Sequence, residues 1–188
     1  MATDKTDHVA LYRKRQLVGM MYALKAVKKG NFKLSSGKES EFYVDGRLAA
    51  LDPETLALVA PQMGQIISEY QFDSVGCMEG PGSTTLLGAL LIGYGMNRMN
   101  MPVSGFVVRK QAKAHGTGRM LEGVCGNSPI LIDDVATSGK SIIHAAQNMP
   151  VKPVVAVVIL DREEGAKEVL LEMGITLRSI LTLKDLAL

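Results

Sequence analysis

Apolar runs alternate with helix-like segments through most of the chain, and this alternation constrains the fold more than any other feature. The apolar runs lie at residues 74–79, 103–109, 130–132, 153–161 and 175–183. Helix patterns accompany them at residues 53–70, 83–96, 141–146 and 163–173. Strands that are connected through helices pair in parallel, because the crossover brings each strand back in the same direction. We therefore predict an α/β fold with a parallel central sheet flanked by helices.

The N-terminal part shows a different pattern. A helix is predicted over residues 5–29, where a glycine ends it. Two short strands are predicted around Phe32 and Val44, with a Ser-Ser-Gly turn between them. The 188 residues suit one domain with a buried core. We expect a single domain over residues 1–188, with residues 51–188 forming most of its core.

Composition excludes several classes of protein. Hydrophobic residues make up 47% and charged residues 21% of the chain, which is typical of a globular protein. The net charge of +2 gives no reason to expect nucleic-acid binding, and no apolar run is long enough to span a membrane. The first residues carry no apolar signal segment. Cys77 and Cys125 lie far apart without metal-binding spacing, so we expect a reducing, cytoplasmic setting.

Each of four predicted strands ends in a polar segment that carries charge, glycine or hydroxyl groups. The segments are EGPGSTT, RKQAKAHGTG, DDVATSGKS and DREEGA, in chain order. Ligands of parallel sheets bind at the carboxyl ends of the strands, where these segments should meet. In and next to these segments, positive charge would come from Arg109, Lys110, Lys113, His115, Arg119 and Arg162, and negative charge from Asp133 and Asp134. The sequence therefore predicts a cleft that binds an anionic ligand.

The stretch ILIDDVATSGKS contains the strongest local signal. It is not a nucleotide-binding P-loop, because Asp134 occupies the position where that motif needs its first glycine. The hydroxyls and backbone N–H groups of residues 137–141, at the start of a helix, fit one monophosphate. The aspartates come one step earlier, where the hydroxyls of a 5′-phosphorylated sugar would lie. The alternative is an ordinary strand–turn–helix with Asp134 as a helix cap.

These motifs resemble those of the type I phosphoribosyltransferases, and most closely those of the orotate phosphoribosyltransferase family. ILIDDVATSGKS resembles the motif that binds 5-phosphoribosyl 1-diphosphate (PRPP) in the whole superfamily. RKQAKAHGTG, FKLSSGKESEFYVDGR and DREEGA resemble segments of the orotate enzymes. The motifs occur in family order over residues 30–166. The resemblance implies the type I fold, in which residues 1–50 would form a small hood over the core.

The resemblance also implies a role for each motif. The PRPP-binding residues would be Arg109, Lys110, Lys113, His115, Asp133, Asp134, Val135, Ala136, Thr137, Ser138, Gly139, Lys140 and Ser141. Thr137 and Arg162 would bind orotate, whose carboxylate suits a guanidinium. Lys113, Asp133 and Asp134 would be the catalytic residues. Mg²⁺ would be held through PRPP, with Asp133 and Asp134 as candidate ligands. A cis peptide bond would lie between Gly82 and Ser83.

The implied reaction transfers the phosphoribosyl group of PRPP to orotate and gives orotidine 5′-phosphate and diphosphate, in pyrimidine biosynthesis. The implied assembly is a homodimer in which the 110–123 loop reaches the partner's site, with no nucleic-acid or membrane partner. Two alternatives stay open: a phosphoribosyltransferase for another nucleobase, and a non-catalytic regulator that senses PRPP. The chain also departs from some relatives, which carry lysine at the positions of Ser35 and Thr84.

Overall fold

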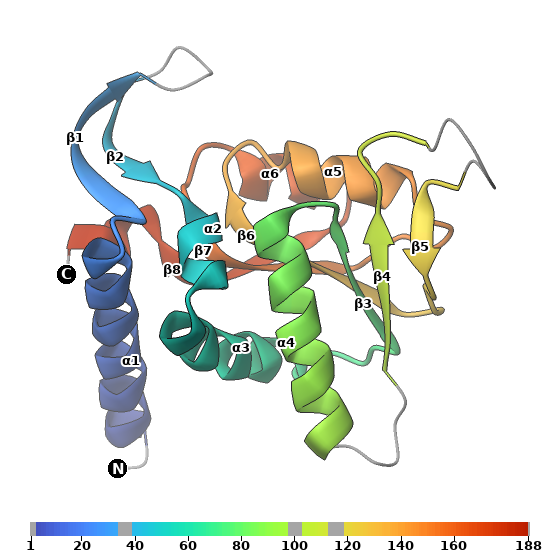
Figure 1. Cartoon of the computed structure of the whole chain (residues 1–188), viewed down its shortest axis with the longest axis horizontal. Coiled ribbons are helices and arrows are strands. Elements are labelled where there is room, and N and C mark those ends of the chain that lie inside the picture. The colour runs from blue at the N-terminus through green and yellow to red at the C-terminus, as the bar shows by residue number, and fades with distance from the viewer. Residues whose placement is uncertain (1–2, 34–38, 98–102, 113–118, 188) are drawn as a thin grey trace.

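The centre of the fold is a six-stranded sheet, seen in a computed structural model that describes residues 3–33, 39–97, 103–112 and 119–187 (Figure 1). In spatial order the strands are β5 (Leu121–Gly123), β4 (Ser104–Val108), β3 (Ser74–Met78), β6 (Pro129–Ala136), β7 (Val155–Asp161) and β8 (Thr176–Thr182). All neighbouring pairs are parallel except β4 and β5. The predicted parallel central sheet is confirmed.

Helices cover both faces of this sheet. They are α3 (Pro53–Ile67) and α4 (Pro81–Asn97) on one face, and α5 (Lys140–Gln147) and α6 (Ala166–Glu172) on the other (Figure 1). Alternate side chains of strand β6 pack into the hydrophobic cores on the two faces of the sheet. Ile130 and Ile132 pack on the side of α3 and α4, whereas Leu131 packs on the side of α5 and α6. A strand buried on both faces reads as a continuous apolar run, which is the pattern seen in the sequence.

The N-terminal elements correct one prediction. Helix α1 spans Thr3–Ala23, so the predicted helix over residues 5–29 is too long. Lys25 ends it with a left-handed backbone, φ 57°, and the next residues enter strand β1 (Val27–Lys33). This strand pairs antiparallel with β2 (Glu39–Val44) in a separate two-stranded sheet. The apolar spacing that suggested a longer helix instead buries Val27 in the core.

Three short elements have no counterpart among the predictions. They are α2 (Gly46–Leu51), β5 (Leu121–Gly123) and the 3₁₀ helix η1 (Leu183–Ala187). Asp45 caps α2 by accepting a hydrogen bond from the backbone N–H of Arg47. The described part of the chain contains no helix that is long and apolar enough to cross a membrane.

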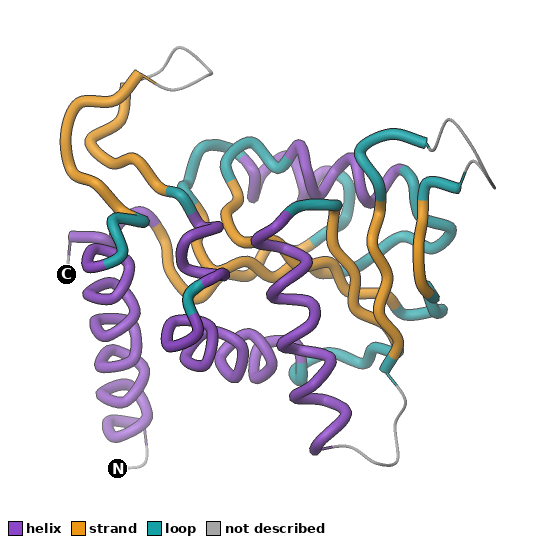
Figure 2. The backbone as a smooth tube through the Cα atoms, in the orientation of Figure 1, coloured by secondary structure: helices purple, strands orange, loops and turns teal. Residues whose placement is uncertain are grey.

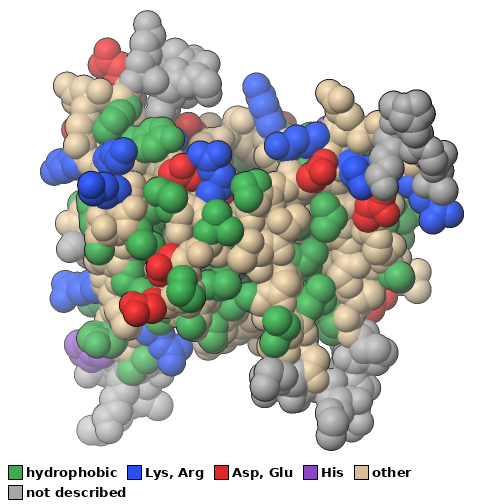
Figure 3. Space-filling view, in the orientation of Figure 1, with side chains coloured by type: hydrophobic (Ala, Val, Ile, Leu, Met, Phe, Trp, Pro, Cys, Tyr) green, Lys and Arg blue, Asp and Glu red, His purple; other side chains and the backbone are tan. Residues whose placement is uncertain are grey.

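The carboxyl ends of the parallel strands lie at one edge of the sheet. Figure 2 shows the loops that follow β3, β4 and β6 along this edge, beside the first turns of α4 and α5. The same edge carries many of the charged side chains that are visible in Figure 3. The described residues of the segments that follow these strands therefore lie along one edge of the sheet.

Candidate active site

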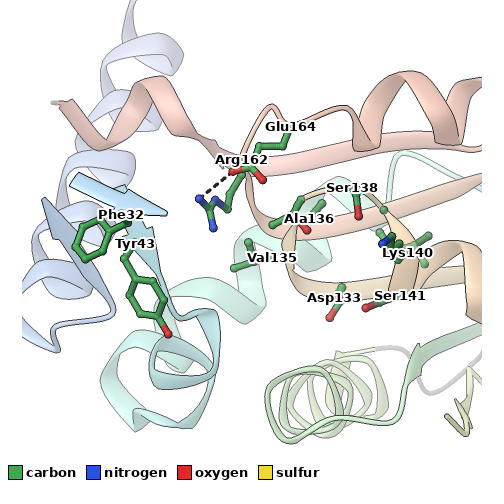
Figure 4. Close-up of a pocket in the computed structure, with 13 residues that line it drawn as sticks. Phe32, Tyr43, Asp133, Val135, Ala136, Ser138, Lys140, Ser141, Arg162 and Glu164 are labelled. Carbon is green, nitrogen blue, oxygen red and sulfur yellow. Dashed lines mark ion pairs between the residues drawn. The ribbon is translucent and has the colours of Figure 1, made fainter. Parts of the chain in front are cut away.

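A cavity of about 740 Å³ opens at the carboxyl ends of β6 and β7 (Figure 4). Its lining combines the end of β6, the turn before α5, the residues after β7, and aromatic side chains from the β1–β2 hairpin. The lining residues are Phe32, Tyr43, Asp133, Val135, Ala136, Thr137, Ser138, Gly139, Lys140, Ser141, Ile142, Arg162 and Glu164. The structure thus brings Arg162 into the same cavity as the predicted phosphate turn.

The turn between β6 and α5 contains the residues predicted to hold a phosphate. Gly139 has a left-handed backbone with φ 75°, which a side chain would strain, and α5 begins directly after it. Two backbone bonds tie the turn to the segment after β7: Arg162 N–H donates to the Ala136 carbonyl, and Ala166 N–H donates to that of Thr137, at 2.9 and 3.1 Å. The turn therefore presents hydroxyl groups on a fixed backbone.

Asp133 is buried at the end of β6, with 7% of its surface exposed. Its Oδ1 accepts hydrogen bonds from the Ser83 hydroxyl at 2.8 Å and from the Asp134 N–H at 2.9 Å. Burial, and then the charge of Asp134, raise the pKa of Asp133 to about 7. Two adjacent carboxylates in a partly dry site repel each other, so a cation or a set of hydroxyl donors would stabilise them together.

Asp134 faces a second, smaller cavity of about 200 Å³. It is lined by Arg47, Met78, Glu79, Gly80, Pro81, Gly82, Ser83, Lys110, Asp133, Asp134, Val135 and Ser141. A Cβ atom on Gly82 would lie 2.5 Å from Asp134 Oδ2, and one on Gly46 would lie 2.5 Å from Val135 Cγ2. Glycine at both positions lets the starts of α2 and α4 approach the end of β6.

The predicted cis peptide bond between Gly82 and Ser83 is wrong. The described residues contain no cis peptide bond, and α4 begins at Pro81. The bond between Gly82 and Ser83 lies in the first turn of this helix. A regular α-helix requires trans bonds there.

Arg162 lies between the hairpin and the phosphate turn, and only 8% of its side chain is exposed. Its Nη2 pairs with Glu164 Oε1 at 2.8 Å and lies 3.4 Å from the Phe42 carbonyl of β2. Its Nε is buried and has no hydrogen-bond partner among the described residues. An unpartnered buried N–H is costly, so it marks a place for a ligand acceptor. Glu163, which lies next to Glu164 in the chain, pairs with Lys184 instead.

The predicted cations after β4 fall into three groups. Lys110 is exposed and lines the smaller cavity. Arg109 pairs with Glu122 of β5, with 3.1 Å between Nε and Oε1, and it is not among the residues that line the two cavities. Lys113 and His115 lie outside the described residues. The structure therefore places Lys110 beside the aspartates and Arg109 at the edge of the sheet.

The donor set near the aspartates fits a magnesium ion that shares its ligands with a substrate. Carboxylate oxygens are the hard ligands that Mg²⁺ prefers, and protein sites usually supply only one or two of them. The described residues contain no group of three or more metal-ligating side chains. Asp133 and Asp134 could thus hold the ion only together with oxygen atoms from a bound ligand or water.

Sequence reasoning assigned no ligand role to two residues of this site. Arg47 lines the smaller cavity, although its VDGR segment was noted only for its resemblance. Glu164 lines the larger cavity beside Arg162. The DREEGA segment shows the charge pair locally. Nothing local in the sequence places Arg47 next to Asp134, because α2 and β6 are far apart along the chain.

Comparison with known proteins identifies the family. The chain is 35% identical over 164 residues to an orotate phosphoribosyltransferase of Mycobacterium tuberculosis, covering 85% of this chain and 88% of that one. It is 35% identical over 181 residues to an orotate phosphoribosyltransferase of Methanopyrus kandleri, covering 92% and 91%. Among solved structures, the Mycobacterium tuberculosis orotate phosphoribosyltransferase in complex with PRPP aligns with a TM-score of 0.69 and 26% identity, covering 94% of this chain and 99% of that one.

No protein-family model matches the chain. The alignments with the two relatives nevertheless cover most of this chain and most of each relative, at 35% identity. Identity at this level over most of both chains shows the family. The chain belongs to the orotate phosphoribosyltransferase family.

Proposed function

We propose that the protein transfers the 5-phosphoribosyl group of PRPP to orotate and releases diphosphate, as a step in pyrimidine nucleotide synthesis. One observation carries the proposal. The larger cavity holds a buried carboxylate, a hydroxyl-lined turn and a buried arginine with an unpartnered Nε. The three features suit a ribose ring, a 5-phosphate and an anionic base.

Each substrate group then has a chemical partner in the cavity. The 5-phosphate would accept hydrogen bonds from the backbone and hydroxyls of residues 137–141. Asp133 and Asp134 would accept hydrogen bonds from the ribose 2- and 3-hydroxyls. The orotate carboxylate would accept a hydrogen bond from the Nε of Arg162, and Thr137 would lie beside it. The aromatic pair Phe32 and Tyr43, with ring centroids 5.7 Å apart, would cover the base from the hairpin.

The protein's part in the reaction is to position charged groups around the substrates and to exclude water from the reacting carbon. The bond from the orotate N1 to the ribose C1 forms as the bond from C1 to the diphosphate oxygen breaks. The diphosphate leaves with the electron pair, and the N1 proton of orotate passes to water or to the leaving diphosphate. The transition state resembles an oxocarbenium ion, which the carboxylates at the end of β6 would stabilise electrostatically. Mg²⁺, when bound, would supply positive charge to the diphosphate and order the ribose hydroxyls.

The remaining cations and the assembly follow from the resemblance. Arg109, Lys110, Lys113 and His115 would neutralise the diphosphate, with Lys113 acting in the transition state.

The protein would be a homodimer in which the 110–123 loop contributes to the partner's site. Exposed apolar side chains on α2 and α4 support a partner surface here; they are Leu48, Leu51 and Ile92. Figure 3 shows hydrophobic side chains over this region.

The free thiols Cys77 and Cys125 suit a reducing compartment such as the cytoplasm. The N-terminal hairpin and helix would act as a hood over the base within one domain. Arg162 supports this arrangement, because it lies within 3.4 Å of the Phe42 carbonyl on β2.

The test is a steady-state assay of orotate consumption with PRPP and Mg²⁺. We expect diphosphate release with orotate, little release with uracil, adenine or xanthine, and no release when EDTA replaces Mg²⁺. Release with a neutral base but not with orotate would favour a phosphoribosyltransferase of different specificity. Tight PRPP binding without turnover of any base would favour a regulator.

Shared sites can be tested separately by mixing two inactive variants. Lys113→Ala removes a loop residue, and Asp133→Asn removes a residue of the β6 site. If the loop serves the partner, mixed dimers contain one complete site and regain activity. Mixtures that stay inactive, although the variants exchange subunits, would contradict loop sharing.

A further inference from the structure

Arg47 is a charged residue of the smaller cavity that the proposed mechanism leaves unused. It lies in the first turn of α2, directly after strand β2, and its side chain is 57% exposed. It lines the smaller cavity together with Lys110 and Asp134. It also lines an adjoining cavity of about 240 Å³, which contains Asp134, Thr137 and Arg162. Arg47 thus borders both spaces beside Asp134.

The guanidinium of Arg47 is held in place by the carboxylate of Asp45. Its Nε lies 2.8 Å from Asp45 Oδ1, and its Nη2 lies 2.7 Å from Asp45 Oδ2. This bidentate pair occupies the Nε–Nη2 edge of the guanidinium, so the Nη1 side is the part that a further anion would meet. Asp45 is largely buried, with 16% of its side chain exposed, and caps α2 as well. The carboxylate therefore holds Arg47 in place without covering its exposed side.

The backbone of Arg47 is fixed against the rest of the site. A Cβ atom on Gly82 would lie 3.3 Å from the Arg47 Cα and 2.5 Å from Asp134 Oδ2. The starts of α2 and α4 and the end of β6 therefore meet at Gly82. A side chain that extends from this point needs no rearrangement of the backbone to reach the smaller cavity.

The charge balance of the smaller cavity requires cations when a diphosphate is bound. Its lining contains three carboxylates, Glu79, Asp133 and Asp134, and two basic side chains, Arg47 and Lys110. A diphosphate would add further negative charge beside the carboxylates, and charge repulsion at a few ångströms is substantial in a partly dry site. Arg47 supplies half of the basic side chains in the described lining.

We propose that Arg47 binds the diphosphate of PRPP, and the released diphosphate, as an additional ligand of the smaller cavity. The inference rests on the proposed function, because it assumes that PRPP lies with its ribose at Asp133 and Asp134. Arg47 would share its donors between Asp45 and a diphosphate oxygen. The 5-phosphate, at the turn of residues 137–141, would not touch it.

The experiment compares Arg47→Ala and Arg47→Lys with the wild-type protein and with Arg178→Ala as a matched control. Arg178 also forms a two-atom pair with a carboxylate, that of Glu69, but it lines neither cavity. Calorimetric titrations with magnesium diphosphate and with ribose 5-phosphate separate the two anion sites. Kinetics with PRPP and orotate then give each KM and kcat.

We expect Arg47→Ala to weaken diphosphate binding about tenfold or more and to lower kcat/KM for PRPP by a similar factor. Binding of ribose 5-phosphate, the melting temperature and the KM for orotate should change less than about twofold. Arg47→Lys should recover part of the loss, because it keeps the charge but loses the two-atom pair with Asp45 that orients the side chain. Arg178→Ala should behave as wild type.

Unchanged diphosphate affinity in Arg47→Ala would overturn the inference. So would an equal loss of ribose 5-phosphate and diphosphate binding, since that would indicate a general disturbance of the site. A wild-type protein that binds diphosphate but does not convert orotate and PRPP would overturn the proposed function instead. The titrations decide the role of Arg47 independently of turnover.

Discussion

The Nη2 atom of Arg162 lies 2.8 Å from Oε1 of Glu164, and both side chains line the larger cavity. Figure 4 shows the pair beside the phosphate turn, with the guanidinium directed towards the hairpin. Glu164 compensates the charge of a nearly buried arginine in the free protein, yet leaves the Nε of Arg162 without a partner among the described residues. The pair thus keeps a cation in place and a donor available for an acidic base.

Replacing Arg162 by glutamine should impair recognition of orotate selectively. The variant loses the charge and the fork, and a hydrogen bond to a charged group contributes about 1.5–3 kcal/mol. We expect the KM for orotate to rise by about 10- to 100-fold and the KM for PRPP to change less than about threefold. Arg178→Gln is the control for loss of a paired arginine elsewhere. Equal rises in both KM values would contradict a base-reading role.

Asp133→Asn should stabilise the ligand-free protein at alkaline pH. The folded-state pKa of Asp133 is raised to about 7 by burial and by the charge of Asp134, so the acid form is the better-tolerated one. A raised pKa contributes stability that is fully present below the unfolded-state value of about 4 and is lost as the pH rises through 7. Asparagine stays neutral and keeps an acceptor for the Ser83 hydroxyl.

The measurement is urea unfolding of both proteins in EDTA, at several values between pH 4 and pH 8.5. The free energy of unfolding of the variant should exceed that of the wild type by a growing margin above pH 5. One pKa unit corresponds to about 1.4 kcal/mol, so the margin should reach on the order of a few kcal/mol. A difference that does not depend on pH would show that Asp133 does not titrate in this range. The variant should also bind PRPP poorly.

Gly82→Ala should damage the site although alanine favours helices. The new Cβ would lie 2.5 Å from Asp134 Oδ2, so the carboxylate or the start of α4 must move. We expect weaker PRPP binding, by about tenfold, with no gain in stability. Gly88→Ala in the same helix meets no atom within 4 Å and should stabilise the protein by about 0.5–1 kcal/mol with normal kinetics. Normal PRPP affinity in Gly82→Ala would disprove the close approach.

Gly139→Ala should weaken binding of the 5-phosphate. Gly139 has φ 75°, and a left-handed backbone costs a residue with a side chain about 1–2 kcal/mol. Relieving that strain would turn the backbone of the phosphate turn away from its ligand. Gly174→Ala, with φ 71° at the end of α6, carries the same backbone cost away from the cavity. Both variants should melt at lower temperature, but only Gly139→Ala should lose affinity for ribose 5-phosphate.

Local patterns were sufficient for the parallel sheet and for its functional edge. The buried run before Asp133 and the small polar residues after it identify a strand, a turn and a helix within a dozen positions. The same patterns failed at the end of α1, where the spacing of apolar residues fits either a longer helix or a strand. Pairing with β2 makes this segment a strand: Val27 pairs with Val44, which lies 17 positions further along the chain.

The sequence by itself determined the five parallel strands with the helices between them, the phosphate turn and the acidic end of β6, because these depend on period, chain direction and turn chemistry over a few residues. Only the tertiary structure decided that Arg47 borders Asp134, that Glu164 holds Arg162 beneath the hairpin, and that Asp133 is buried enough for its pKa to rise. Distances between elements and the loss of water around a side chain arise from packing of the whole chain, and no local pattern encodes them.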